Sequence, residues 1–327
     1  MSFPISRRRV LAAAAGLGAA ALGATGAQAQ AAFTRQITLV VPTAAGGGSD
    51  TVARTLAPHL SAALGQPVVV ENKLGAGGSI AAAAVAKAPA DGHTLLVGSS
   101  ATHGANPSLY KTLQYDPIRD FVPVVPIGSF LFGVVAHPSV PASSIKELVA
   151  YAKANPGKLS YAGVSSTSIV MTETLLRGAD IDILKVPHRS AAIAMPDLVS
   201  GRISLAVLDL ATGGAFVRDG RLKALAITSR ERSTLFPDLP TIGESVVPGF
   251  AVESWIGLFA PAKSPEALVE RMNAAVRAAL ARPEVSTKLA GLSFDIRTSG
   301  VQEFRDFVPK EIEKFTRLVR AAGIQAE

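Results

Sequence analysis

ITLVVPTAAGGGSD, which spans residues 37–50, leads directly into TVARTLAPHLSAALG, residues 51–65. The first part begins with β-branched and other apolar residues that predict a buried strand, and Val52, Leu56 and Leu60 then recur at helical spacing. Glycines between the two let a small anion approach the N–H groups at the positive end of the helix. The segment therefore predicts a strand, an anion-binding loop and a helix.

The first 29 residues predict an export signal. Arginines at 7–9 precede an apolar run over 10–22, and a signal-peptidase motif with small residues at its first and third positions follows at 27–29. We therefore expect cleavage after Ala29 and a periplasmic mature chain. Residues 6–11 also resemble a twin-arginine signal, which leaves the twin-arginine and general secretory routes both open. The apolar run is shorter than the ~20 residues of a membrane span, and we expect no spanning helix elsewhere.

Composition narrows the possible partners. Removal of the three leader arginines lowers the formal net charge from +7 to +4, and no basic run interleaved with aromatics follows, so nucleic acid is not an expected partner. The chain has no cysteine, and its five histidines are scattered. We therefore expect a fold held by core burial, with no disulfide, metal site or cofactor.

The rest of the first third repeats the opening pattern. VVVEN, KLGAGGSIAAAAVAKA and GHTLLVG predict a strand, a second glycine-rich turn with a helix, and a third strand. Strands that alternate with helices indicate an α/β fold with a mainly parallel sheet. In such sheets ligands bind beyond the carboxyl ends of the strands, where both glycine loops are expected to meet.

A second α/β region follows. Residues 106–126, rich in proline, tyrosine and aspartate, predict an irregular connection, and FLFGVVAH (130–137) predicts a strand. WIGLFA (255–260) predicts a strand that returns to the first region, and two amphipathic helices then close the chain. This order predicts a lobe 1 of 32–135 plus 258–327 and a lobe 2 of 136–257.

Two crossings between such lobes would form a two-strand hinge, and a cleft would lie beside it. The sequence favours hinge segments near 134–137 and 257–260. Clefts of this type close on small ligands.

Several blocks in order resemble the Bug (TctC-like) family of periplasmic receptors of tripartite tricarboxylate transporters. They include VPTAAGGGSDTVAR, LGQPVVVENKLGAGGSIAA, PADGHTLLVG, LKALAITSRERSTLFPDLPTIGES and WIGLFAPAKSP. The resemblance implies a two-lobed periplasmic-binding-protein fold of type II, with Rossmann-like lobes. It implies a monomer without catalytic activity that captures a small carboxylated solute for a TctA/TctB-like membrane permease.

The resemblance also implies the site. The first loop would hold the ligand's carboxylate through Thr43, Ala44, Ala45, Gly46, Gly47, Gly48, Ser49 and Asp50, and the second lobe would add Ser165, Ser166, Thr167, Ser168, His188, Arg189 and Ser190. Two departures affect the second lobe: the family usually has Tyr-Lys/Arg-Gly where this chain has His188-Arg189-Ser190, and the serine turn is about two residues shorter. Independently of the resemblance, Asp209 ends the strand-like LAVLD and could reach the cleft.

Two other functions remain open from the sequence. An exported enzyme could use the Gly46-x-Gly48 loop for a dinucleotide, with Glu71 on the ribose, although Thr51 stands where the third glycine is needed. Ser165 could be a hydrolase nucleophile, but its surroundings lack the closing glycine of G-x-S-x-G. A solute sensor for a membrane signalling protein would share the receptor fold.

Overall fold

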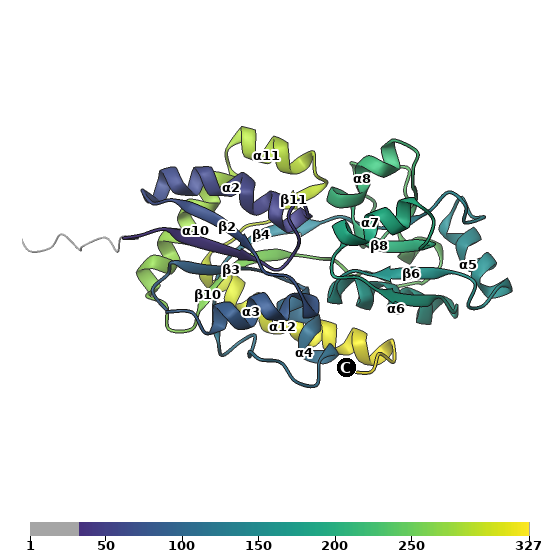
Figure 1. Cartoon of the computed structure of the whole chain (residues 1–327), viewed down its shortest axis with the longest axis horizontal. Helices are drawn as coiled ribbons and strands as arrows, with labels where there is room; N and C mark the ends of the chain where they lie inside the picture. The colour runs from purple at the N-terminus through teal and green to yellow at the C-terminus, as the bar shows by residue number, and fades with distance from the viewer. Residues whose placement is uncertain (1–32, 327) are drawn as a thin grey trace, which may run out of the picture. The chain divides into compact units, whose positions relative to one another are not determined.

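The computed structural model describes residues 33–326, so the predicted export signal lies outside the described residues. These residues form two β-sheets with helices packed around each of them. In Figure 1, lobe 1 (purple, blue and yellow) stands beside lobe 2 (teal and green). The α/β fold with two lobes is confirmed.

Lobe 1 is built on a six-stranded sheet with the order β11-β4-β10-β3-β1-β2. Its strands are β1 (Ile37–Val41), β2 (Val68–Asn72), β3 (Thr94–Ser99), β4 (Phe121–Phe130), β10 (Ile256–Pro261) and β11 (Phe294–Ile296). β1 pairs in parallel with β2 and β3, whereas β10 runs antiparallel between β3 and β4. The sheet is therefore mixed rather than mainly parallel, because the return strand enters its middle.

Lobe 2 repeats this arrangement in a five-stranded sheet with the order β7-β6-β8-β5-β9. Its strands are β5 (Phe132–Ala136), β6 (Ser160–Gly163), β7 (Leu184–Pro187), β8 (Leu205–Asp209) and β9 (Lys223–Ile227). β6 pairs in parallel with β7 and β8, and β5 runs antiparallel between β8 and β9. In each lobe the strand that enters from the other lobe runs antiparallel to both of its neighbours, and in lobe 1 the edge strand β11 is also antiparallel to β4.

The helices cover the faces of both sheets. Lobe 1 carries α2 (Gly48–Leu64), η1 (Ala76–Gly78), α3 (Ser79–Ala86), η2 (Ala101–Ala105), α4 (Asn106–Leu109), α10 (Glu266–Leu280), α11 (Pro283–Ala290) and α12 (Val301–Ala321). Lobe 2 carries α5 (Ile145–Ala154), α6 (Ser166–Ala179), α7 (Ala191–Val199), α8 (Leu210–Arg218) and α9 (Ile242–Ser245). No helix within residues 33–326 is both long and apolar enough to cross a membrane.

The chain passes between the sheets at two places. Leu131 separates β4 of lobe 1 from β5 of lobe 2, and the return occurs just before β10, near Ser254. The segments expected to be hinges, 134–137 and 257–260, fall largely on β5 and β10 instead. The chain changes sheet at Leu131, between β4 and β5. The sequence does not reveal this point, because FVPVVPIGSFLFGVVA is apolar on both sides of the crossing.

Part of the segment expected to be irregular is a strand. The ten residues of β4 include Pro123 and Pro126, which donate no backbone hydrogen bond. Both prolines face β10 where the register of that pair shifts, opposite Phe259 and Gly257. Local irregularity in the ladder therefore accommodates prolines that argued against a strand.

The core of lobe 1 contains a buried histidine. His103 is fully buried, its ring stacks on Phe259 with 3.8 Å between centroids, and Phe121 meets it edge-on at 4.8 Å. Its Nδ1 lies 2.9 Å from Oγ1 of Thr102, and its Nε2 has no hydrogen-bond partner. Burial lowers the pKa of His103 to about 3, so the folded protein keeps this imidazole neutral.

We predict that His103 makes the folded state less stable in acid. Its pKa is near 6.5 in the unfolded chain, so between that value and about 3 only the unfolded state takes up the proton. Stability then falls as pH falls, by up to about 1.4 kcal/mol per pH unit from this group. His103→Phe keeps the aromatic stack and should flatten the decline measured by urea unfolding at pH 7, 6 and 5.

His59→Gln is the matched control, since it removes a half-exposed histidine from α2 without touching the core. Equal slopes for the wild-type chain and His103→Phe would show that another group causes the acid sensitivity.

Candidate functional site

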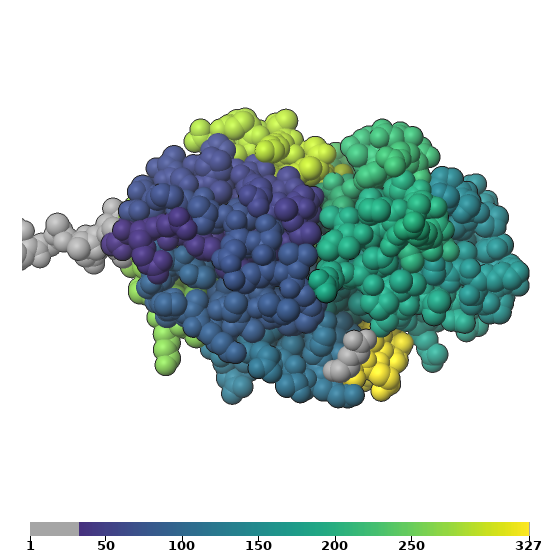
Figure 2. Space-filling model, in the orientation of Figure 1, coloured from purple at the N-terminus to yellow at the C-terminus, as the bar shows by residue number. Residues whose placement is uncertain are grey.

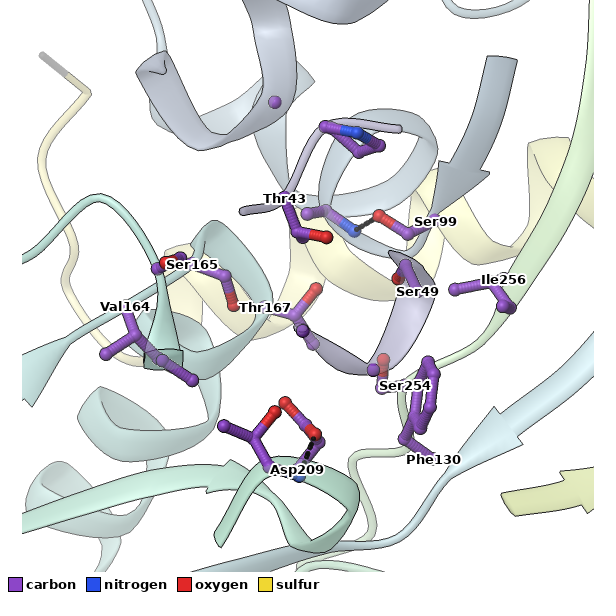
Figure 3. Close-up of a pocket in the computed structure, with 18 of the residues that line it drawn as sticks. Thr43, Ser49, Ser99, Phe130, Val164, Ser165, Thr167, Asp209, Ser254 and Ile256 are labelled. Atoms are coloured by element: carbon purple, nitrogen blue, oxygen red, sulfur yellow. Dashed lines mark hydrogen bonds between the residues drawn. The ribbon is translucent and has the colours of Figure 1, made fainter. Parts of the chain in front are cut away.

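A cavity of about 90 Å³ lies between the two lobes. It is lined from lobe 1 and the crossing segments by Pro42, Thr43, Gly47, Gly48, Ser49, Gly77, Gly78, Ser99, Ala101, Phe130, Ser254 and Ile256, and from lobe 2 by Phe132, Val164, Ser165, Thr167, Arg189, Ser190, Ala191, Ala192, Asp209 and Thr212. In Figure 2 the lobes meet along one line on the face shown, and Figure 3 shows the side chains around the cavity. At ~15 Å³ per water, the volume suits a small solute.

Equivalent loops of the two lobes form the walls. In lobe 1 they follow β1, β2 and β3, and in lobe 2 they follow β6, β7 and β8, which hold the same positions in their sheet. Each of these loops leaves the carboxyl end of a parallel strand and leads toward a helix. The site thus lies where the open-sheet rule predicts it, but with six loops rather than two.

The helices that face the cavity from lobe 1 begin without a side-chain cap. Gly47 precedes α2 and Gly78 precedes α3, and neither helix start has a side-chain hydrogen bond. Because the first N–H groups of a helix lack an intrahelical acceptor, the amides at the start of α2 are available to a ligand. Gly78 has φ +91°, and a side chain there would meet Pro42 and Thr102 within 3.0 Å.

The helices that face the cavity from lobe 2 are capped by their own side chains. Ser165 accepts from the amide of Ser168 at 3.1 Å, Ser190 from that of Ile193 at 3.4 Å, and Asp209 from that of Thr212 at 2.8 Å. Such caps satisfy one N–H of each first turn. The strongest free anion site is therefore on the lobe 1 side.

Asp50 holds the first loop in place. Its carboxylate is buried and accepts hydrogen bonds from the amide of Gly46 at 2.9 Å, from Arg54 at 3.0 Å and from Asn72 at 2.9 Å. Burial alone would raise the pKa of Asp50, but these hydrogen bonds and the Arg54 charge lower it overall. Asp50 does not line the cavity, so it shapes the loop from behind.

The structure brings together most of the expected site. Thr43, Gly47, Gly48, Ser49, Ser165, Thr167, Arg189, Ser190 and Asp209 line the cavity, whereas Ala44, Ala45, Gly46, Asp50, Ser166, Ser168 and His188 do not. Ser168 donates to the carbonyl of Val207, and Nε2 of His188 lies 3.2 Å from the Asp197 carboxylate. These two side chains are engaged within lobe 2.

Several lining residues were missed from the sequence. The cavity has an apolar wall formed by Phe130, Phe132, Val164 and Ile256. Phe130 ends β4, and Phe132 and Ile256 begin β5 and β10, so three of these residues lie next to the points where the chain passes between the lobes. Their apolar runs indicate buried strands but not which side chains face a cleft. Ser99 is the last residue of β3, at its carboxyl end, so the rule that found the two glycine loops could also have found it.

The lobes touch each other beside the cavity. Ser100 of lobe 1 lies 2.9 Å from Thr167 of lobe 2, hydroxyl to hydroxyl, and 3.3 Å from Ser254 in the crossing segment. All three side chains are buried. A Cβ on Gly77 would lie 2.2 Å from Oγ of Ser166, so only glycine allows this approach. The structure therefore shows the lobes closed on each other.

Two charged side chains of opposite sign line the cavity. Arg189 is exposed and forms no ion pair with any residue in the described part of the chain. Asp209 likewise has no ion-pair partner among residues 33–326, and burial raises the pKa of its carboxyl group. Each charge is free to meet a charged group of a bound solute.

The geometry disfavours both enzyme alternatives. Glu71 pairs with Lys73 and does not line the cavity, so it is not placed to bind the ribose of a dinucleotide held there. Ser165 caps α6, and none of the described cavity residues is a histidine, so the usual serine–histidine pairing is not formed there.

Comparisons with known proteins agree with this fold. A family model described as the tripartite tricarboxylate transporter family receptor matches residues 52–324. A protein from the tcbD-tcbE intergenic region of Pseudomonas sp. is 38% identical over 96% of this chain and 94% of its own length. Protein BugT of Bordetella pertussis is 33% identical, over 88% of this chain and 90% of its own.

Solved structures show the same similarity. Rpa4515 of R. palustris, solved with adipate, has a TM-score of 0.87 at 34% identity and covers 90% of this chain and 99% of its own. MatC from Rhodopseudomonas palustris, solved with bound malate, has a TM-score of 0.83 at 36% identity, with coverages of 88% and 99%. These are binding proteins rather than enzymes. The chain belongs to the TctC (Bug) family of tripartite tricarboxylate transporter receptors.

Proposed function

We propose that this chain is a periplasmic receptor that binds a small carboxylate in the cavity between its lobes and delivers it to a TctA/TctB-like permease. The observation that carries the proposal is the uncapped start of α2, whose amides line the cavity beside the glycines that precede α3. A carboxylate there would accept hydrogen bonds from Gly48 and Ser49 and favourably meet the helix dipole.

The relatives support this ligand class. The adipate-bound and malate-bound proteins share the fold and about a third of the sequence. Their ligands are both carboxylates, and the small cavity of this chain suits molecules of that size. A BugD structure described as a periplasmic binding protein, 32% identical, supports the periplasmic location.

The second lobe would complete the site when it closes. Arg189, free of an acidic partner among the described residues, could bind a second acidic group of the solute through its planar guanidinium. The Ser100–Thr167 contact would hold the lobes together around it. The same closed surface could be recognised by the permease, or by a membrane sensor if the receptor serves signalling.

The first test is thermal melting of the mature chain with mono-, di- and tricarboxylates, acidic amino acids and aromatic acids, with NAD and ATP as controls. A ligand at ~100 times its Kd adds ~2.7 kcal/mol, so a true ligand should raise Tm by several degrees. A response to the nucleotides alone would contradict the receptor proposal.

We predict that Gly47→Asp removes carboxylate binding while it preserves the fold. Gly47 is the N-cap of α2 with φ −72°, and aspartate is a favoured N-cap residue, so the new carboxylate would occupy the amides meant for the solute. Affinity measured by titration calorimetry should fall at least about 100-fold, since each charged hydrogen bond contributes about 1.5–3 kcal/mol.

Gly47→Ala is the control for the added bulk, because it introduces no charge. Unchanged affinity in Gly47→Asp would show that the carboxylate binds elsewhere.

We predict that Gly48→Ala hinders lobe closure. A Cβ at this position would lie 3.1 Å from Oδ1 of Asp209 in lobe 2, so the carboxylate would have to move for the lobes to meet. It would also lie 2.8 Å from the ring of Phe130, which belongs to lobe 1 and would have to shift within that lobe. Alanine suits a helix better than glycine by about 1 kcal/mol, so α2 should not be weakened. Small-angle scattering of the variant with ligand should show a more open particle than the wild-type chain.

Gly300→Ala is the matched control, since a Cβ there would meet nothing within 4 Å. A Gly48→Ala variant that closes like the wild-type chain would rule out this steric role.

A further inference from the structure

Asp209 stands at the point where the two lobes approach the solute. It ends β8 and caps α8, and its Oδ1 lies 3.1 Å from the position that a Cβ of Gly48 would take. Figure 3 shows its side chain at the cavity, on the side opposite Thr43 and Ser99. Gly48 is the first residue of α2, so the acid of lobe 2 faces the helix end that we propose for the solute's carboxylate.

This placement brings the carboxylate of Asp209 close to the proposed position of the solute's carboxylate. Two carboxylates close together in a small cavity repel each other unless a proton or a cation lies between them. Asp209 has no ion-pair partner among residues 33–326, and Arg189 is the cation that shares the cavity without contacting it. The missing partner of Asp209 can be supplied by the solute.

Two hydroxyl groups beside the same space also lack partners. Oγ1 of Thr212, on the first turn after Asp209, and Oγ1 of Thr43, on the first loop, are buried without a hydrogen bond. Both residues line the cavity. Buried polar atoms normally have partners, so these two atoms indicate that the cavity is built for a polar ligand.

We propose that Asp209 makes the receptor selective for 2-hydroxy or 2-amino carboxylates, whose hydroxyl or ammonium group donates a hydrogen bond to it. The inference rests on the proposed function, which places the solute's carboxylate at α2. Because Asp209 lies so near Gly48, the donor has to sit on the carbon next to that carboxylate to reach both. The hydroxyls of Thr43 and Thr212 would complete the polar end of the site.

The test compares matched solutes that differ only by the donor: malate or aspartate against succinate, and glutamate against glutarate. The wild-type chain should bind the substituted member at least about tenfold more tightly by titration calorimetry, as expected for a hydrogen bond to a charged group. Asp209→Asn should bring this ratio to within about threefold, most completely for the ammonium, which loses its counter-charge.

Asn still accepts the hydrogen bond from Thr212, so the cap of α8 is kept in this variant. Ser144→Ala is the control, because it removes the cap of α5, whose side chain accepts from Glu147 away from the cavity. It should lower Tm and leave the ratio unchanged.

The outcomes separate this inference from the proposed function. Succinate bound as tightly as malate and aspartate, or ratios that stay the same in Asp209→Asn, would overturn the selectivity while carboxylate binding stands. Failure of the wild-type chain to bind any carboxylate of the pairs would overturn the proposed function itself. If only the aspartate and glutamate ratios respond to Asp209→Asn, the solute class narrows to 2-amino acids.

Discussion

The free amides at the start of α2 are the feature on which the rest of the site depends. A glycine cap leaves them without a side-chain acceptor, and the buried carboxylate of Asp50 fixes the loop that presents them through its bonds to Gly46 and Asn72. An acid in the first helical turn also suits the dipole. The Asp50 carboxylate does not line the cavity, so it can hold the loop while the amides at the start of α2 stay available to a ligand.

The two lobes have the same topology around the cavity but different residues at the helix starts that face it. Their sheets share one strand order, so the loops after β1, β2 and β3 correspond to those after β6, β7 and β8. Lobe 1 places Gly47 and Gly78 before α2 and α3 and Ser100 before η2, whereas lobe 2 places Ser165, Ser190 and Asp209 at the starts of α6, α7 and α8. Lobe 1 therefore offers backbone donors, and lobe 2 offers side chains that can discriminate among solutes.

Close packing at the lobe boundary gives the glycines a second role. Gly48 faces Asp209 of lobe 2 at 3.1 Å, and Gly77 faces Ser166 of lobe 2 at 2.2 Å, each measured from the position that a Cβ would take, so a side chain at either glycine would force its neighbour to move. The glycines that line the cavity are thus also the ones that let the lobes approach each other. Binding and closure are consequently difficult to alter independently at these glycines. Gly47 is different, because a Cβ there would contact only Thr43 and Ala44 of the same loop, so a substitution at Gly47 can affect binding without affecting closure.

Much of this protein could be predicted from its sequence. Alternating strands and helices indicated two α/β lobes, and the glycine-rich loop indicated an anion site, because backbone geometry and hydrophobic periodicity are local properties. The family resemblance pointed to a receptor, and the comparisons confirmed the family.

Tertiary structure decided the rest. The point at Leu131 where the chain passes between the lobes could not be seen in the sequence, because it lies within an apolar run. β4 forms despite its two prolines because shifts in its register with β10 accommodate them. Which side chains face the cleft depends on how one lobe lies against the other: Phe130 and Asp209 do, whereas His188 turns to Asp197. The sequence by itself determined the elements and the kind of ligand charge they favour. Only long-range packing decided which atoms meet the solute, since no local pattern encodes the contacts between lobes.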